Sequence, residues 1–385
     1  MSKIISTLSK MWLKVKNLET SLFPELQEQF GVLSPKEQKL IKILDFAEIE
    51  KNVCTTSKTN PPKDREQIAR AFIAKSVYNF QTTRDLIDRL HIDRTLRILC
   101  GWRYSNNIPS ESKFSRVFKE LSDLKIAEKT HEQFVKEYLS EKLFFYNATD
   151  ATKIPLREKA VKKEKDEKVK YKVGRPKKGE TREPIKPTIL KQQQDMQTVE
   201  EMLSLVSRDC GVGIKQSAKG NREVWIGGSL HISVVDGDIP IIAFYSGANV
   251  HDSSLALPLI QETSKRVAYM YDLQDAGYDA DIIREFSKKH NHKPIIDINP
   301  KNSQELRDKI ELKEHEGKTF KYLNQHLNLD KEHYNQRSMV ERVNAYLKDN
   351  FGCNKIYYQG ANKVASVLAF GILSVCIHQS LKLVT

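Results

Sequence analysis

Apolar residues recur at intervals of three and four positions through most of the first 140 residues, which is the spacing of a helical face. The pattern is clearest over 86–102 and 112–124. In the second segment the residues along one side are Phe114, Val117, Phe118 and Leu121. We therefore predict a helical N-terminal region over residues 1–140. The polar stretch 103–110 fits the turn of a helix-turn-helix DNA reader, and it also fits a plain connection in a helical bundle.

The pattern changes after residue 142, where short runs of β-branched and aromatic residues replace the helical spacing. In chain order we predict a strand at 143–154, a hairpin at 223–248 that turns at 237–240, a helix at 253–266, a strand at 267–275, a helix at 281–290 and a strand at 293–300. A strand and a hairpin followed by alternating helices and strands form a mixed sheet. The predicted fold class is therefore α/β (α+β), with a sheet domain over 141–352.

Two stretches of this sheet domain differ from the rest. Residues 153–222 are rich in Lys and Arg, and we predict a basic, partly disordered insertion there. Residues 301–333 are predicted to be a smaller charged insertion. Residues 353–385 follow as a C-terminal helix packed on the sheet domain. Its most apolar part, 364–376, is shorter than the ~20 residues that span a bilayer, so we expect a buried helix and no membrane partner.

Residues 334–348 are predicted to form one amphipathic helix. At about 100° per residue, the side suited to burial carries Met339, Val340, Val343 and Leu347. The opposite arc carries Tyr334, Arg337, Glu341 and Lys348. A lone carboxylate between two cations can hold a metal ion beside a polyanion. The same charges also suit an ordinary surface helix.

Charge points to a partner. The 385 residues include 63 Lys and Arg against 50 Asp and Glu, a formal net charge of +13, which favours nucleic acid. Residues 153–191 alone hold 15 Lys and Arg against 6 Asp and Glu. Within them Arg175, Lys177 and Lys178 belong to the segment 173–179, which resembles the Gly-Arg-Pro core of an AT-hook, in which an extended arginine enters a narrow minor groove. The alternative is a solvated linker that touches phosphates without reading sequence.

Cysteine usage and the N-terminus indicate the compartment. The five cysteines include no C-x-x-C pair, which argues for a reducing environment and against a disulfide framework or a zinc site. The first 17 residues lack the sustained apolar core of a secretory signal. We expect a cytoplasmic protein of two or three domains.

Three acidic residues lie where they could converge on metal ions. Asp150 and Asp275 each end a strand, and Gly277 permits a tight turn after the second. Glu341 comes from the amphipathic helix. Phosphodiester cleavage by two metals needs carboxylates gathered from separate elements, and Mg²⁺ prefers carboxylate oxygens. Singly, such acids more often cap a turn; Asp272 is a rival to Asp275 but lies within its strand.

Taken together, these residues resemble the DDE transposases of bacterial insertion sequences. The match to the branch with the signature Tyr-x2-Arg-x3-Glu-x6-Lys is complete at Tyr334, Arg337, Glu341 and Lys348. The blocks around the family's first two aspartates are similar to 150–154, 227–232, 247–253 and 275–279. The resemblance covers 145–352 and extends loosely toward the N-terminus through 109–116.

The resemblance implies an RNase H-like fold for the sheet. The catalytic, metal-binding residues that it implies are Asp150, Asp275 and Glu341, with two Mg²⁺ ions that Mn²⁺ can replace. The DNA contacts that it implies are Tyr334, Arg337 and Lys348. The implied activity is that of a transposase that binds terminal inverted repeats, cleaves double-stranded DNA and joins the freed end to a target, as a homodimer on paired ends.

One position departs from the family. Ser229 stands where members commonly carry Lys or Arg, which removes a phosphate contact. Two alternatives therefore stay open: a catalytically decayed, transposase-derived DNA-binding protein, and a metal-dependent nuclease of the same fold. With a carboxylate triad available, His231 and His251 are expected to pack or hydrogen-bond within the fold.

Overall fold

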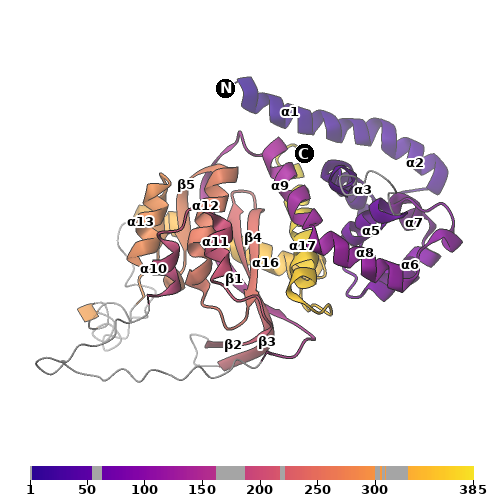
Figure 1. The fold of residues 1–385 in the computed structure, drawn as a ribbon. Coiled ribbons are helices and arrows are strands. Elements are labelled where there is room, and N and C mark those ends of the chain that lie inside the picture. The colour runs from indigo at the N-terminus through magenta and orange to yellow at the C-terminus, as the bar shows by residue number, and fades with distance from the viewer. Residues whose placement is uncertain are drawn as a thin grey trace, which may run out of the picture.

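A helical region and a mixed sheet lie side by side, and the C-terminal helix lies between them (Figure 1). This is a computed structural model, and it describes residues 2–53, 63–161, 187–216, 222–299, 304–305, 308 and 328–385. One large apolar core contains residues of the N-terminal helices, the central strands and the C-terminal helix. The two regions are therefore packed against each other.

The N-terminal region is helical, as predicted. Its helices are α1 (Ser2–Asn17), α2 (Phe23–Phe30), α3 (Pro35–Ala47), α4 (Glu50–Val53), α5 (Arg65–Val77), α6 (Thr83–Ile92), α7 (Arg94–Cys100), α8 (Glu111–Asp123) and α9 (Ile126–Tyr138). Ser34 and Thr82 form capping boxes that start α3 and α6. Asp93 divides the apolar pattern of 86–102, because its side chain accepts from the Leu96 amide at 2.9 Å and starts a new helix. The helix-turn-helix reading of α7 and α8 stays a prediction.

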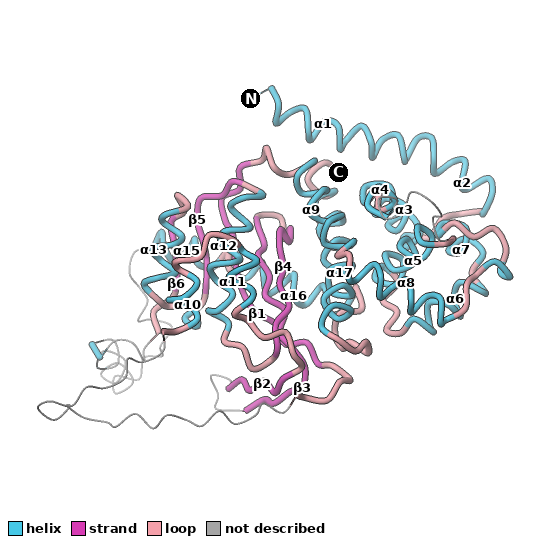
Figure 2. The backbone as a smooth tube through the Cα atoms, viewed as in Figure 1, coloured by secondary structure: helices cyan, strands magenta, loops and turns pink. Residues whose placement is uncertain are grey.

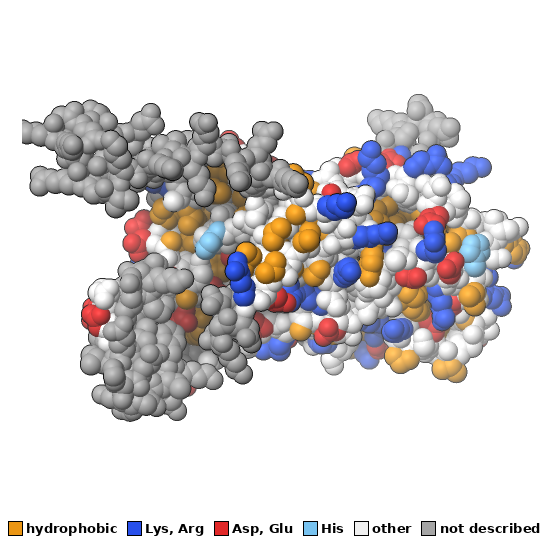
Figure 3. Space-filling view, turned by 90° about the horizontal axis from the view of Figure 1, so that it is seen from below, with side chains coloured by type: hydrophobic (Ala, Val, Ile, Leu, Met, Phe, Trp, Pro, Cys, Tyr) orange, Lys and Arg blue, Asp and Glu red, His pale blue; other side chains and the backbone are white. Residues whose placement is uncertain are grey.

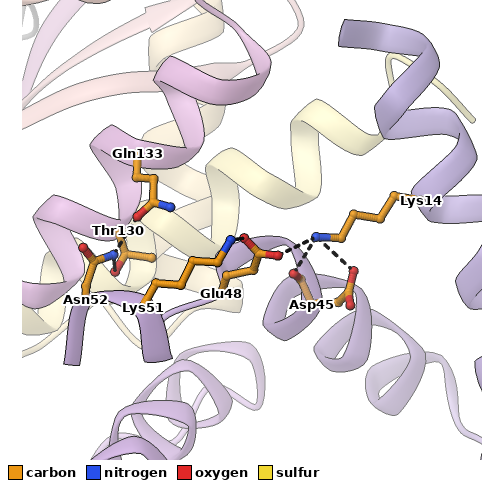
Figure 4. A network of polar contacts seen from close by, with 7 residues as sticks. All are labelled: Lys14, Asp45, Glu48, Lys51, Asn52, Thr130 and Gln133. Atoms are coloured by element: carbon orange, nitrogen blue, oxygen red, sulfur yellow. Dashed lines mark hydrogen bonds and ion pairs between the residues drawn. The ribbon is translucent and has the colours of Figure 1, made fainter. Parts of the chain in front are cut away.

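A polar network ties the first helix to its neighbours (Figure 4). The Lys14 ammonium donates to the backbone oxygen of Asp45 at 2.9 Å and to the Glu48 carboxylate at 3.3 Å. The Asn52 amide donates to the Thr130 hydroxyl of α9 at 3.1 Å. Partly exposed contacts of this kind contribute about 1 kcal/mol or less each, so they orient α1 against α3, and α4 against α9, more than they stabilise these helices.

Six strands form the sheet: β1 (Leu143–Pro155), β2 (Gly211–Gln216), β3 (Arg222–Val235), β4 (Ile239–Gly247), β5 (Ala268–Gln274) and β6 (Lys293–Ile296). β3 pairs antiparallel with both β4 and β1, while β1, β5 and β6 pair in parallel (Figure 2). The predicted hairpin is β3–β4, which turns at Gly237 and Asp238, both with positive φ. β4, β1, β5 and β6 therefore run in one direction, and their carboxyl ends meet at one edge of the sheet.

Helices cover both faces of the sheet (Figure 1). One face carries α10 (Ile189–Gln193), α11 (Val199–Ser204), α12 (Ala256–Arg266) and α13 (Asp281–Lys289), and the other carries α15 (Asn328–Asn335) and α16 (Ser338–Asn350). Thr263 of α12 donates to Ser233 of β3 at 2.8 Å. Tyr146 of β1 bonds His333 of α15 at 2.7 Å. Because side chains alternate along a strand, the even-numbered residues of β1 face α15 and α16.

The C-terminal helix α17 (Ala361–Leu381) is buried, as predicted. By length and composition it could cross a membrane, but 83% of its apolar window is buried inside the fold. It packs on α5, α8 and α9 as well as on β4, and the rings of Phe72 and Phe370 lie 5.7 Å apart. α17 therefore joins the helical region to the sheet.

The predicted helix 334–348 is two helices. α15 and α16 meet at Gln336 and Arg337, where backbone amides bond carbonyls three residues back, as from Arg337 to Tyr334 at 2.9 Å. These tight turns interrupt regular α-helical bonding. The four apolar residues predicted to be buried there are buried.

The two predicted insertions are described in part. Within 153–222 the structure describes the end of β1, the helices α10 and α11, and the strand β2. Residues 162–186 lie outside the described residues, as does most of 301–333.

Candidate active site

The parallel pairing of β1 with β5 sets the position of two acids. The last paired residues are Ala148 and Leu273, and the same register carried two residues further places Asp150 opposite Asp275. β5 ends one residue before Asp275, whereas β1 continues to Pro155. Both acids therefore lie where β1 parts from β5, at the edge where the strands' carboxyl ends meet.

The prediction that Asp150 ends its strand is wrong. Residues 151–155 continue β1, because they pair antiparallel with β3. Asp275 does follow its strand, as predicted, and its Oδ1 accepts from the Gly277 amide at 2.8 Å. A Cβ built on Gly277 would lie 2.9 Å from that oxygen. The glycine thus lets the carboxylate close onto the turn at Ala276–Tyr278.

The two carboxylates repel each other. Burial, and then the charge of Asp275, raise the pKa of Asp150 to about 6. A cation between them would remove that repulsion and favour the ionised form of both.

The helices α15 and α16 run along the same face of β1. Tyr146 contacts His333 at one end, and the Lys348 ammonium donates to the Thr152 hydroxyl at 2.5 Å at the other. The two helices cover about 22 Å between these contacts at 1.5 Å per residue, and the strand covers about 20 Å at 3.3 Å per residue. Asp150 is an even-numbered residue between the contacts, so it faces the middle of this helical pair.

Arg337 lies among the acids at that point. Its Nη2 is 2.5 Å from Glu341 Oε1. Burial opposes the charged form of the guanidinium, yet neighbouring acidic groups raise the pKa of Arg337; they are Tyr334, Glu341, Asp150 and Asp275. The guanidinium therefore supplies positive charge to all three predicted catalytic acids.

Glu341 does not meet the other two acids directly. Within the described part of the chain, no three Asp, Glu, His or Cys side chains gather closely enough to hold one metal ion. Asp150 and Asp275 supply two facing carboxylates, the donor type that a hard divalent cation prefers. The Glu341 side chain is 55% exposed, so it is able to turn from Arg337 toward them. With Glu341 turned toward Asp150 and Asp275, the three carboxylates fit a divalent metal ion.

Asp272 lies on the other face of the sheet. It is fully buried, and its Oδ1 accepts from the Asn147 amide at 3.1 Å. Asn147 and Asp272 are three positions before Asp150 and Asp275, an odd step that reverses the direction of a side chain. Burial raises the pKa of Asp272 to about 7. This placement separates Asp272 from the helices α15 and α16.

Two further acids near the site were missed from the sequence. Asp252 follows β4 and Asp297 follows β6; burial chiefly, and Asp275 in addition, raises the pKa of each. Tyr334 donates its hydroxyl to Asp297 at 3.2 Å. Asp297 comes directly after β6 and Asp252 comes five residues after β4, and that signal identifies them once the strand directions are known.

The remaining predicted residues are placed as follows. His231 is buried and bonds Ser246 at 2.8 Å, and His251 bonds Ser253 at 2.8 Å, so both bond within the fold as expected. The predicted DNA contacts Arg175, Lys177 and Lys178 lie outside the described residues.

Two family models match the chain. One, described as a transposase DDE domain, matches residues 148–377, more than half of the chain, and the other, described as a transposase domain (DUF772), matches residues 27–120. No curated protein and no solved structure matches it. The mixed sheet, in which β1 pairs antiparallel with β3 and in parallel with β5, is RNase H-like, as the resemblance implied.

Proposed function

This chain belongs to the DDE transposase family, and from that premise we propose that it binds the terminal inverted repeats of its own insertion sequence and catalyses metal-dependent DNA cleavage and strand transfer. The supporting observation is the position of Asp150 opposite Asp275 at the carboxyl ends of the central strands, with Glu341 on the adjacent helix.

We assign Asp150, Asp275 and Glu341 as ligands of two Mg²⁺ ions, which Mn²⁺ can replace. When bound, the ions activate water or a 3′-hydroxyl for in-line attack and stabilise the leaving oxygen. Glu341 takes part by exchanging the Arg337 guanidinium for the cation. That exchange leaves Arg337 free to fork onto a phosphate.

The DNA follows the polar side of α15 and α16. Lys348, next to Thr152, places a point charge on a phosphate. Tyr334 exchanges its bond to Asp297 for a base or a phosphate oxygen. Arg175, Lys177 and Lys178 contact the duplex outside this centre. Two transposon ends are handled together, so the working form is a homodimer on paired ends, in the cytoplasm.

Nicking of DNA that carries the inverted repeats bordering this gene tests the proposal. We expect cleavage that requires Mg²⁺ or Mn²⁺ and is abolished in Glu341→Gln, while end binding by that variant persists. Cleavage at the normal rate by Glu341→Gln would show that Glu341 is not a ligand.

A decayed, DNA-binding derivative is the second candidate. Two observations favour it: Glu341 is paired with Arg337 rather than with the other acids, and Ser229 replaces a basic residue of the family. Such a protein would bind the ends and leave them uncut with either metal. A nuclease of the same fold would cut the ends without joining them to target DNA.

A further inference from the structure

A cavity of about 560 Å³ lies against β1 next to the acidic centre. Its lining includes Lys153, Lys215, Arg222, Trp225, Ser229 and Lys348, which come from β1, β2, β3 and α16. None of Lys153, Lys215 and Arg222 has a role in the site described above. At the end of the sheet where β2 and β3 lie, the surface seen from below shows basic side chains beside apolar ones (Figure 3).

Ser229 connects this cavity to the departure seen in the sequence. It lines the cavity and is paired in register with Lys153 of the adjacent strand. Four basic side chains and two acidic ones, Glu223 and Asp252, line the space, so the lining is positive overall. Cations from neighbouring strands thus surround the position at which a basic side chain is missing.

Among the described residues, the cations of the cavity are incompletely paired. Lys153 forms an ion pair with Glu223, but no ion pair joins Lys215 or Arg222 to another residue in the described segments. Burial, and then the charge of Lys153, lower the pKa of Lys348, and Lys215 adds to that effect. Like charges that crowd a cavity in this way are stabilised by an anion.

In the two-stranded ribbon of β2 and β3, the Trp225 side chain is held in place by its contacts. A Cβ at Gly213 would lie 2.3 Å from the Trp225 ring, so the ring packs directly on the glycine backbone. The indole N–H donates to the Gly228 oxygen at 3.1 Å. Lys215 stands two residues after Gly213 on the same side of the strand. The ribbon therefore holds its cations in place beside the sheet.

We propose that this cavity binds a phosphodiester of the DNA strand that enters the acidic centre, with Lys215 and Arg222 as its principal contacts. The inference rests on the proposed function. Asp252 lines the same cavity, as do Ala151 and Thr152, the two residues that follow Asp150, so a phosphate bound there lies next to the carboxylates. The β2–β3 ribbon is thereby part of the DNA-binding surface, and it supplies the charge that Ser229 lacks.

The test measures binding of a labelled DNA duplex of arbitrary sequence to the full chain in EDTA, over a series of salt concentrations. Each of Lys215→Ala and Arg222→Ala should weaken binding about fivefold near physiological salt and lower the slope of log affinity against log salt by about 1. Lys265→Ala is the matched control, because it removes an equal charge from α12 on the opposite face. It should leave the slope unchanged.

A rescue variant separates charge from folding. Ser229→Lys, which the cavity has room for, should restore most of the affinity and slope that Lys215→Ala loses. Unchanged slopes in Lys215→Ala and Arg222→Ala, beside a wild-type chain that binds and cuts DNA, would overturn this inference alone. A wild-type chain that does not bind DNA would overturn the proposed function and this inference with it.

Discussion

The two faces of the sheet at β1 and β5 carry acid pairs of opposite character. On one face Asp150 lies opposite Asp275, both acids are close to cationic side chains, and the pKa of Asp150 is raised partly by its neighbour's charge. On the other face Asp272 is paired with the neutral Asn147 and is fully buried. Asp272 and Asp275 are only three positions apart, yet Asp275 lies near Arg337, whereas Asp272 lies where burial favours its protonated form.

The comparison shows that strand register, rather than residue type, sets the surroundings of an acid here. An acid on the α15 and α16 face meets Arg337 and Lys348, whereas an acid on the α12 face meets hydroxyls and amides. Asp272 belongs to a chain of hydrogen bonds through Asn147 and Ser233 to Thr263. Isosteric substitutions on the two faces should therefore have different consequences.

The largest difference should appear in cleavage. Asp275→Asn removes a carboxylate that we propose as a metal ligand, and losing about 4 kcal/mol of transition-state stabilisation should slow cleavage by roughly 10³-fold. Asp272→Asn keeps the bond to Asn147 and should cleave within about twofold of wild type. Rates of Mg²⁺-dependent nicking measure both. Equal losses in the two variants would mean that the faces do not differ in function.

The pH dependence of stability should distinguish the faces next. The pKa of Asp272 is raised in the folded state to about 7, so the folded chain favours the protonated form. The stabilisation that protonated Asp272 gives to the folded state is complete below the unfolded pKa of about 3.9. It is lost as pH rises toward 7, and the free energy of unfolding falls by up to about 4 kcal/mol. Asp272→Asn does not titrate, so its stability relative to wild type should increase over this range. Denaturant unfolding at a series of pH values measures the difference, and a constant difference would contradict a buried acid.

On the face that carries Asp150 and Asp275, metal affinity should fall as the pH is lowered. Since the pKa of Asp150 is about 6, protons compete with the cation below that pH, and affinity should decrease about tenfold per pH unit. Asp275→Asn removes one of the proposed ligands and should weaken binding over the whole pH range. Binding of Mn²⁺ followed by electron paramagnetic resonance gives the affinity of each protein at each pH. An affinity that does not change with pH would exclude Asp150 as a ligand.

The smallest effect should come from the turn after β5. Gly277→Ala places a Cβ about 2.9 Å from Asp275 Oδ1, so the carboxylate must move by a few tenths of an ångström. We expect a loss of cleavage of about tenfold or less, equal to about 1.4 kcal/mol, with little change in thermal stability. A normal rate would show that the turn does not position Asp275.

Local pattern was sufficient to predict much of the fold. The alternation in β1, the turn of the β3–β4 hairpin and the helical spacing before residue 140 each depend on neighbours within a few positions. The division at Arg337 was not predictable in this way, because the helical pattern continues through it. The bounds of β1 were predicted within one residue, but the place of Asp150 was misjudged: it is not the end of the strand, since residues 151–155 pair with β3, which follows about 70 residues later.

The candidate site was predictable only in part. Asp150, Asp275 and Glu341 were proposed from their positions and the family signature. The register that sets Asp150 opposite Asp275 depends on the pairing of β1 with β5, which the sequence alone does not reveal. Predicting Asp252 and Asp297 as members of the site would have required the directions of β4 and β6. The pairing of Glu341 with Arg337 is an i, i+4 contact that the helix permits, yet competition with a metal is a property of the whole site.

Iron-directed cleavage tests the central claim most directly. Fe²⁺ in place of Mg²⁺ generates hydroxyl radicals that cut the polypeptide near the bound ion, and the fragments report which segments surround it. We predict cuts next to Asp150, Asp275 and Glu341 in the DNA-bound wild-type chain, and their loss in Asp275→Asn but not in Asp272→Asn. Cuts that avoid the Glu341 segment, or that persist in Asp275→Asn, would contradict a metal centre shared by these three acids.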